Sequence, residues 1–149
     1  MNNPPSNKDF ISDLFRRIEA DGDWNTLFEA LSDDIVWTVT GTSPVTGVFK
    51  GKQACVEGLI LPVQKTMAEP FRCQIQRILV EGDAAVVLWK GSSTTKTGLP
   101  YRQEYCWILE LKDRKIVSVR AFFDTLLATM ALLSCKEGHP AYAAQDARP

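Results

Sequence analysis

Histidine is nearly absent from this chain of 149 residues. His139 is its one histidine, and the four cysteines form no Cys-x-x-Cys pair. Metal sites and Ser-His-Asp or Cys-His catalysis need such side chains in clusters, and the sequence has none. A glycine-rich phosphate-binding loop is missing as well. We therefore expect no metal site and no cofactor.

Strong charge and long apolar runs are also lacking. The 17 Lys and Arg nearly balance the 18 Asp and Glu, so the formal net charge of -1 gives no reason to expect binding to nucleic acid or to an anionic membrane. No apolar run approaches the ~20 residues that a membrane helix needs. Residues 1–8 lack the basic and apolar regions of a signal peptide. These absences predict a cytoplasmic protein whose cysteines are reduced and free.

The chain has the composition of an ordinary globular domain, with 45% hydrophobic and 23% charged residues. Its length suits one domain with a core that needs no disulfides. We expect this domain to span residues 7–133. Residues 1–6 and 134–149, the latter including His139, are expected to be flexible termini.

Three helices are predicted in the first half. Ser6 can cap the first, and apolar residues at helical spacing follow it up to Ile18. Asp23 can cap a short second helix. A third is expected to start near Lys52, and Pro62 should kink or end it because proline lacks the N–H that a helix requires. Residues 41–51 are predicted to be a loop between a strand and this helix.

Strands dominate the second half. Residues 35–40 alternate in the manner of a strand, and from Pro70 onward alternating segments are separated by short turns. The longest pair, residues 101–111 and 117–124, is joined by a tight charged turn. A short helix-permissive segment, residues 125–133, follows. Helices first and then long antiparallel strands predict an α+β fold.

The hairpin of residues 101–124 is the best place to look for a site, because it combines large aromatic side chains with one carboxylate at its end. Tyr105 and Trp107 share one face of their strand, and Glu104 and Cys106 share the other. If the aromatic pair faces inward, Tyr105 can donate a hydrogen bond to a substrate carbonyl. If the register is the other one, Glu104 faces inward as an acid–base group. The aromatics could equally be core residues without a function.

Four stretches carry a resemblance to a known family. They are residues 33–37, the glycines 41, 47 and 51 with Lys52, the strand 101–107, and residues 115–124. Together they resemble the nuclear transport factor 2-like superfamily, and within it the SnoaL-like branch with polyketide cyclases, ketosteroid isomerase and limonene epoxide hydrolase. The resemblance implies a cone-shaped fold, in which three N-terminal helices pack on a strongly curved, mainly antiparallel sheet and enclose a pocket for an apolar small molecule. It also implies a homodimer formed through the outer face of the sheet.

The catalytic residues of these relatives mostly do not carry over. Val39 stands where ketosteroid isomerase has its general base, and Cys106 stands at or beside its second acid. The epoxide hydrolase uses an Asp-Arg-Asp network. Ala121 stands where this network has its last aspartate, and the other two residues of the network correspond to positions near Leu88 and Lys90. Neither of these two mechanisms is therefore expected here, although the fold is.

Asp124 is the remaining catalytic candidate, since many SnoaL-like proteins carry a carboxylate at the end of the last strand. It could act as an acid or base at the rim of the pocket, or it could simply cap the next helix. With Tyr105 and Glu104 it forms our predicted catalytic set. The predicted substrate-binding set consists of Trp37, Val39, Phe71, Leu88, Trp89, Trp107 and Phe122.

Two functions are compatible with these residues. The first is a cofactor-independent enzyme of the isomerase, cyclase or hydratase type, which transfers protons on an apolar, carbonyl-bearing compound. The second is a non-catalytic protein of the same fold that binds a hydrophobic metabolite. A module with a collapsed interior and no ligand is a third reading.

Overall fold

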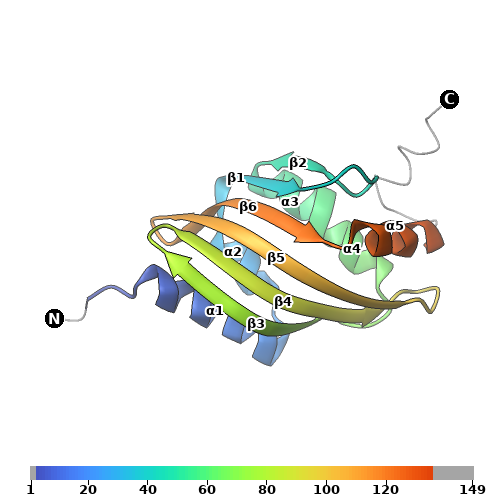
Figure 1. Ribbon diagram of the computed structural model, residues 1–149, viewed down its shortest axis with the longest axis horizontal. Coiled ribbons are helices and arrows are strands. Elements are labelled where there is room, and N and C mark those ends of the chain that lie inside the picture. Colours follow the sequence, from blue (N-terminus) through green and yellow to red (C-terminus); the bar gives the residue numbers. More distant parts are fainter. Residues whose placement is uncertain (1–2, 136–149) are drawn as a thin grey trace.

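The computed structural model describes residues 3–135, and its centre is a curved sheet of six strands with helices packed on one side (Figure 1). The strands are β1 (Leu31–Val39), β2 (Gly47–Lys50), β3 (Arg72–Glu81), β4 (Ala84–Thr94), β5 (Pro100–Lys112) and β6 (Lys115–Phe123). They lie in the order β2-β1-β6-β5-β4-β3, and all neighbours are antiparallel except β1 and β6. The predicted α+β fold is therefore confirmed.

The first helix, α1 (Asn7–Asp21), begins with the predicted cap. Ser6 and Asp9 form a reciprocal capping box, and Gly22 ends the helix in the left-handed conformation. The apolar stripe of α1 is buried, and the side chains of Ile11, Phe15 and Ile18 are fully inaccessible. The shorter α2 (Asn25–Ala30) follows and leads directly into β1.

The third helical segment consists of α3 (Lys52–Cys55), a π-helical stretch (Val56–Ile60) and α4 (Leu61–Thr66). Pro62 was expected to kink or to end the helix, and it does not end it, because α4 continues four residues beyond it, to Thr66. The turn immediately before α4 is a wider π turn, in which the Leu61 N–H donates to the carbonyl of Val56, five residues back. This wider turn accommodates the proline within the helical segment. Pro62 then occupies the start of α4, where a missing N–H costs little.

Two features of the sheet escaped the sequence prediction. Strand β2 lies within residues 41–51, which were expected to be a loop, and it pairs with β1 through Trp37 and Phe49 among others. The parallel pairing of β1 with β6 joins segments about 80 residues apart in the chain. It closes the sheet around the buried face of α1 and thereby creates the conical interior.

The last helix, α5 (Thr125–Ser134), lies beside the end of β6 and α4 (Figure 1). Its residues Ala128, Ala131 and Leu132 are buried in a second apolar cluster with Val45 and Met67. The predicted domain end at residue 133 thus falls one residue before the end of α5. Residues 136–149, including His139, lie outside the described residues, as do residues 1–2.

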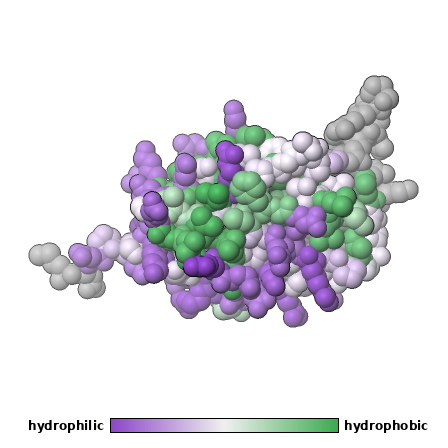
Figure 2. All heavy atoms as spheres, viewed as in Figure 1, coloured by the Kyte–Doolittle hydropathy of each residue, from purple (hydrophilic) through white to green (hydrophobic). Residues whose placement is uncertain are grey.

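The outer face of the sheet carries apolar side chains that a typical solvated strand would not show. Ile108 on β5 is 38% exposed and Phe122 on β6 is 41% exposed. Figure 2, which looks onto this face, shows hydrophobic residues gathered over the strands and again near α5. This surface is considered below as a contact for a second copy of the chain.

Candidate functional site

A pocket of about 110 Å³ lies between the concave face of the sheet and the helices, and its lining is mainly apolar. An apolar cavity of about 150 Å³ is large enough to hold benzene. This pocket is somewhat smaller than that, so the largest compound it suits has about one ring. Five of the seven predicted binding residues line it, together with one predicted catalytic residue: Trp37, Val39, Phe71, Trp89, Trp107 and Tyr105.

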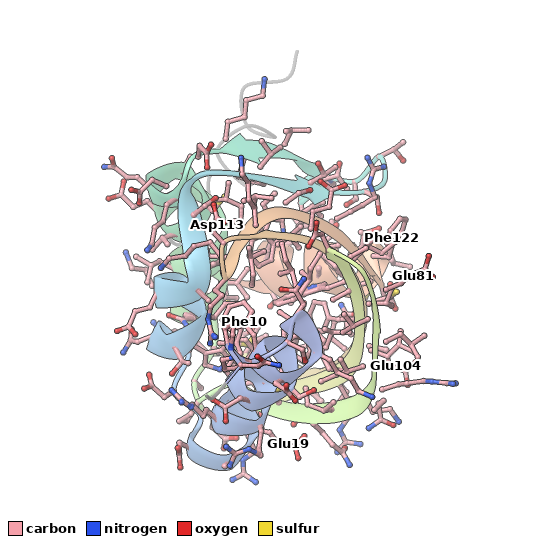
Figure 3. All side chains as sticks on the ribbon, turned by 90° about the vertical axis from the view of Figure 1, so that its left-hand side faces the viewer. Phe10, Glu19, Glu81, Glu104, Asp113 and Phe122 are labelled. Carbon is pink, nitrogen blue, oxygen red and sulfur yellow. The ribbon has the colours of Figure 1, made fainter. Side chains whose placement is uncertain are left out.

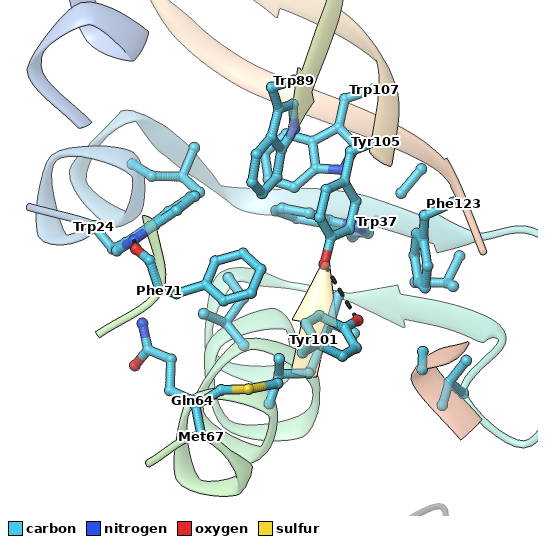
Figure 4. Close-up of a pocket in the computed structure, with 18 residues that line it drawn as sticks. Trp24, Trp37, Gln64, Met67, Phe71, Trp89, Tyr101, Tyr105, Trp107 and Phe123 are labelled. Atoms are coloured by element: carbon cyan, nitrogen blue, oxygen red, sulfur yellow. Dashed lines mark hydrogen bonds between the residues drawn. The ribbon is translucent and has the colours of Figure 1, made fainter. Parts of the chain in front are cut away.

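An aromatic cluster forms most of the wall (Figure 4). Trp89 and Tyr105, from neighbouring strands, stack with ring centroids 4.1 Å apart. Trp107 makes edge-to-face contacts with both Trp89 and Trp37, at 4.9 and 5.0 Å. Such contacts between neighbouring rings hold each of them in a defined orientation. The wall is consequently built from residues that β1, β4 and β5 bring together.

Two phenols supply polar groups within this wall. The hydroxyl groups of Tyr101 and Tyr105 lie 3.4 Å apart, and the side-chain amide of Gln103 donates to the Tyr101 hydroxyl at 3.3 Å. The same amide group makes two hydrogen bonds with the backbone of Asp124, at 2.8 and 2.9 Å. This buried glutamine thus ties the phenol pair, whose mutual contact is drawn in Figure 4, to the end of β6.

Burial keeps both phenols protonated. It raises the pKa of Tyr105 well above its ordinary value, and the neighbouring Tyr101 raises it further. Burial also raises the pKa of Tyr101, against the opposing effect of its hydrogen bonds to Tyr105 and Gln103. At neutral pH these two groups are therefore hydrogen-bond donors and acceptors, and they are poor bases.

The structure settles the register of β5. Tyr101, Gln103, Tyr105 and Trp107 point inward and are buried. Glu104 is exposed on the other face, where its carboxylate lies 3.5 Å from the ammonium group of Lys90. Figure 3 shows Glu104 on the outside of the curved sheet. The alternative with Glu104 as an inward acid–base group is thus wrong, because the larger aromatic side chains take the core-facing positions.

Asp124 does not face the pocket. Its side chain is exposed and accepts a hydrogen bond from the Leu127 N–H at 3.0 Å, which makes it the N-cap of α5. The prediction that the Asp124 carboxylate lies at the rim of the pocket was therefore wrong. The alternative prediction, that it caps the next helix, describes its geometry. The residue approaches the site through its backbone, by the two hydrogen bonds to Gln103.

Two predicted binding residues also lie elsewhere. Leu88 faces outward from β4, opposite Cys106, and Phe122 faces outward from β6 (Figure 3). Both predictions were wrong for one reason: a strand alternates its side chains between two faces, so the inward neighbours are Trp89 and Phe123. Phe123 does line the pocket.

Sequence reasoning missed several residues of the site. Tyr101 lies four positions before Tyr105 and therefore on the same face of the strand, so the two-residue period of a strand could have identified it. Gln64 and Met67 come from the end of α4, and Ala128 comes from α5. No local pattern indicates that these helix ends meet the sheet, since that contact is made only in the folded chain.

Three indole N–H groups in the wall are buried without an acceptor. They belong to Trp37, Trp89 and Trp107, and no hydrogen-bond partner for them occurs among residues 3–135. Trp24 differs, because its indole N–H donates to the Phe71 carbonyl at 3.1 Å. The wall thus contains three indole N–H groups without an acceptor among residues 3–135.

Ionisable groups other than the two phenols do not contribute to the pocket lining in the part of the chain that the structure describes. Within residues 3–135 there is no group of three or more metal-binding side chains. No described helix is both long and apolar enough to cross a membrane. All four cysteines are free, and burial raises the pKa of the Cys73 thiol to about 12.

Comparison with solved structures supports the fold. The chain is 15% identical to a protein assigned as a SnoaL-like polyketide cyclase from Jannaschia sp. CCS1, with a TM-score of 0.68 over 91% of this chain and 98% of that one. An NTF2-like protein of unknown function from Burkholderia pseudomallei K96243 is 19% identical, with a TM-score of 0.69 over 89% and 99% of the two chains. TerC, crystallised with polyporic acid, is 17% identical, with a TM-score of 0.68 over 85% and 98%.

At these identities the likeness shows the fold alone. A comparison with curated proteins found no match. The sequence model of the SnoaL-like domain, however, matches residues 11–119, which is most of the chain. The match includes β1 to β5, most of β6 and the phenol pair of the pocket. The chain therefore belongs to the SnoaL-like domain family, with the fold of the nuclear transport factor 2-like superfamily.

Proposed function

We propose that this protein binds a small, apolar, carbonyl-bearing compound in the pocket, with the ring of the ligand among the tryptophans and its carbonyl oxygen at the phenol pair. The observation that carries the proposal is the lining itself: aromatic walls surround two hydroxyl groups, and the described residues contribute no charged side chain to it. Pockets for small molecules commonly combine an apolar wall with a few polar groups that orient the ligand.

Tyr105 is the proposed anchor for the ligand oxygen. Its hydroxyl has a single partner, Tyr101, at the long distance of 3.4 Å. A carbonyl oxygen that accepts a hydrogen bond from Tyr105 would replace this weak contact by a stronger one. Gln103 holds Tyr101 in place, so the pair is already oriented before a ligand enters.

A matched pair of ligands tests this proposal. Acetophenone and ethylbenzene have nearly the same shape, and acetophenone alone carries a carbonyl oxygen. We expect both to raise the melting temperature of the protein, and acetophenone to bind about fivefold more tightly, as one net hydrogen bond of about 1 kcal/mol implies. Tyr105→Phe should abolish the preference. If neither compound stabilises the protein, the pocket is not a binding site for such molecules.

A proton-transfer enzyme is the second candidate, and the phenol pair is what favours it. In that case Tyr105 would polarise the carbonyl by donating a hydrogen bond, while a base removes a proton from the adjacent carbon and returns it elsewhere on the substrate. Asp124 follows β6 directly, but its side chain faces away from the pocket and caps α5. The absence of a base from the lining within residues 3–135 is why we place binding first.

Asp124→Asn tests the role of Asp124 in the second candidate. Asparagine also caps helices, so this variant should keep α5 intact while it removes the only proposed base. An isomerase or cyclase that uses Asp124 would lose turnover and keep its affinity for the substrate. Equal turnover in the variant and the parent protein would exclude Asp124 from the chemistry.

We further propose that the protein is a homodimer formed through the outer face of the sheet. The exposed side chains of Ile108 and Phe122 support this, because they lie on adjacent strands of that face. Half-buried Cys106 lies directly opposite Phe122 and extends the apolar surface. Burying such a surface against a second copy would remove it from water.

A further inference from the structure

The outer face of the sheet carries opposite charges at its two ends. The pairing of the strands places Glu81 of β3 and Glu110 of β5 in one row, on either side of β4. At the other end of the face, Arg72 of β3 and Arg102 of β5 share a row in the same way. All four residues are exposed, and Figure 3 shows Glu81 on the outside of the curved sheet. One end of this face is therefore acidic and the other end is basic.

Apolar side chains fill the middle of the face. Leu88, Cys106 and Phe122 form one row across β4, β5 and β6. Figure 2 shows the hydrophobic surface over the strands, with hydrophilic side chains around it. Along β5, Cys106 lies four residues from Glu110 and four residues from Arg102. The apolar row is thus midway between the acidic and the basic row.

The charges at the two ends are not neutralised within one copy of the chain. Among residues 3–135, neither arginine of the basic row and neither glutamate of the acidic row forms an ion pair. Lys90 and Glu104 differ, because they pair with each other at 3.5 Å and leave no net charge between them. Arg72 and Arg102 also line a polar hollow of about 480 Å³. The basic end therefore has both the charge and the space to accept carboxylates.

Two-fold symmetry offers two ways to pack this face against its own copy. An axis parallel to the strands brings like ends together, so that the acidic rows oppose each other and the basic rows do the same. An axis across the strands reverses their direction, so that the acidic row of each copy meets the basic row of the other. Aligned packing of two sheets, within about 30°, is compatible with either direction. The charges therefore select the second arrangement.

We infer that two copies pack their outer faces with antiparallel strands, about a two-fold axis that crosses β5 at Cys106, and that Arg102 of each copy pairs with the partner's Glu110. The apolar row of each copy then meets itself, and every charge pair occurs twice. Arg77 on the edge strand β3 would approach its own copy as a like charge, but the two convex faces diverge there. This inference rests on the proposed dimer and adds its orientation.

Charge reversal on β5 tests the orientation. Arg102→Glu and Glu110→Arg each replace two attractive contacts per dimer by two repulsive ones. We expect either variant to dissociate about tenfold more readily than the parent protein in sedimentation equilibrium at low salt. The double variant, with both changes in one chain, restores opposite charges at both contacts and should regain the affinity of the parent protein. Lys65→Glu is the control, because Lys65 is exposed on α4, on the helical side of the sheet, and should have no effect.

A mixture of the two single variants gives a second test. One chain then carries glutamate at both positions and the other carries arginine at both, so opposite charges meet only between unlike chains. We expect heterodimers to exceed both homodimers in native mass spectrometry. This preference should decline as the salt concentration rises, because salt screens exposed charges. Equal populations of like and unlike pairs would contradict the inferred contact.

The outcomes separate the orientation from the dimer itself. If the parent protein remains a monomer at every concentration, both the proposed dimer and its orientation are overturned. If the parent protein is a dimer and the single reversals leave its affinity unchanged, the orientation is wrong and the proposed dimer stands. The same conclusion follows if the double variant stays as weak as the single ones. Circular dichroism of each variant checks that the exposed substitutions leave the fold intact.

Discussion

Trp89 and Tyr105 stack almost in parallel, with their ring centroids 4.1 Å apart and their planes 13° apart. The two residues are direct partners across β4 and β5, so the backbone pairing of the sheet sets this contact. Tyr105 also meets Phe71, Trp107 and Phe123. Its ring is consequently a structural centre of the pocket, whereas its hydroxyl makes one long contact, with Tyr101 at 3.4 Å.

The ring and the hydroxyl of Tyr105 should therefore differ in their effect on stability. Tyr105→Phe keeps the stack and removes one weak hydrogen bond, so we expect a loss below about 1 kcal/mol. Tyr105→Ala removes the ring and should cost about 3–5 kcal/mol. Urea denaturation of the two variants measures both values. Equal losses would show that the hydroxyl, and not the stack, stabilises this region.

Asp124 should matter for stability through its cap. Asp124→Ala removes the acceptor for the Leu127 N–H and should lower the free energy of unfolding by about 1 kcal/mol, whereas Asp124→Asn should change it little. Thermal unfolding followed by circular dichroism compares the two. A large loss in the asparagine variant would mean that the charge itself, rather than the cap, is required.

Gly91 makes room for Phe71 at the edge of the pocket. A Cβ atom at position 91 would lie 2.4 Å from a ring carbon of Phe71 and 2.9 Å from Trp89. Gly91→Ala should displace the Phe71 ring, cost about 1–3 kcal/mol and weaken acetophenone binding. Combining it with Phe71→Leu should cost less than the sum of the single losses. Strict additivity of the two changes would contradict the predicted contact.

Alkaline pH should destabilise the protein through Tyr105. Its pKa is raised in the folded state, so both states keep the proton below about pH 10, the ordinary tyrosine value. Above that pH the unfolded chain loses the proton first, and the free energy of unfolding falls as the pH rises towards the folded-state pKa. Urea denaturation at several alkaline pH values should show a smaller fall for Tyr105→Phe. The Cys73 thiol acts in the same direction in both proteins, so it cancels in the comparison. Identical pH dependence would refute the assignment.

The proposed dimer predicts a position-specific effect of charge. Phe122→Asp places a carboxylate on the apolar outer face and should convert a dimer into monomers without unfolding them. Leu126→Asp is a suitable control, since Leu126 is 69% exposed on α5, outside the sheet. Sedimentation velocity measures the mass of each variant. A parent protein that sediments as a monomer would exclude the proposal.

Much of the fold could be predicted from local patterns. The helical spacing after Ser6 predicted α1 with its cap, because a helix of that amphipathicity buries the same stripe in almost any context. The alternation in residues 71–124 predicted the long strands. Strand β2 was missed because four residues with only Val48 and Phe49 as apolar members are too short to show a period.

The candidate site was predictable only in part. The aromatic residues of β4 and β5 were identified because of their size and spacing. The sequence did not decide which face of β5 points inward, since both faces contain side chains with plausible catalytic chemistry. The burial of both aromatics decides that question: Trp107 meets Phe15 of α1 at 6.1 Å, and Tyr105 stacks on Trp89.

The sequence by itself determined most elements of this protein and its family, because helix caps, periodicity and turn residues act over a few neighbours. The tertiary structure alone decided which side chains share the pocket. The pairing of β1 with β6 and the packing of α4 and α5 beside the pocket depend on contacts between residues far apart in the chain. The free energy of these contacts depends on the whole core. The hairpin turned all its aromatics except Phe122 inward and its carboxylates outward, because burying rings lowers the free energy, whereas burying unpaired charges raises it.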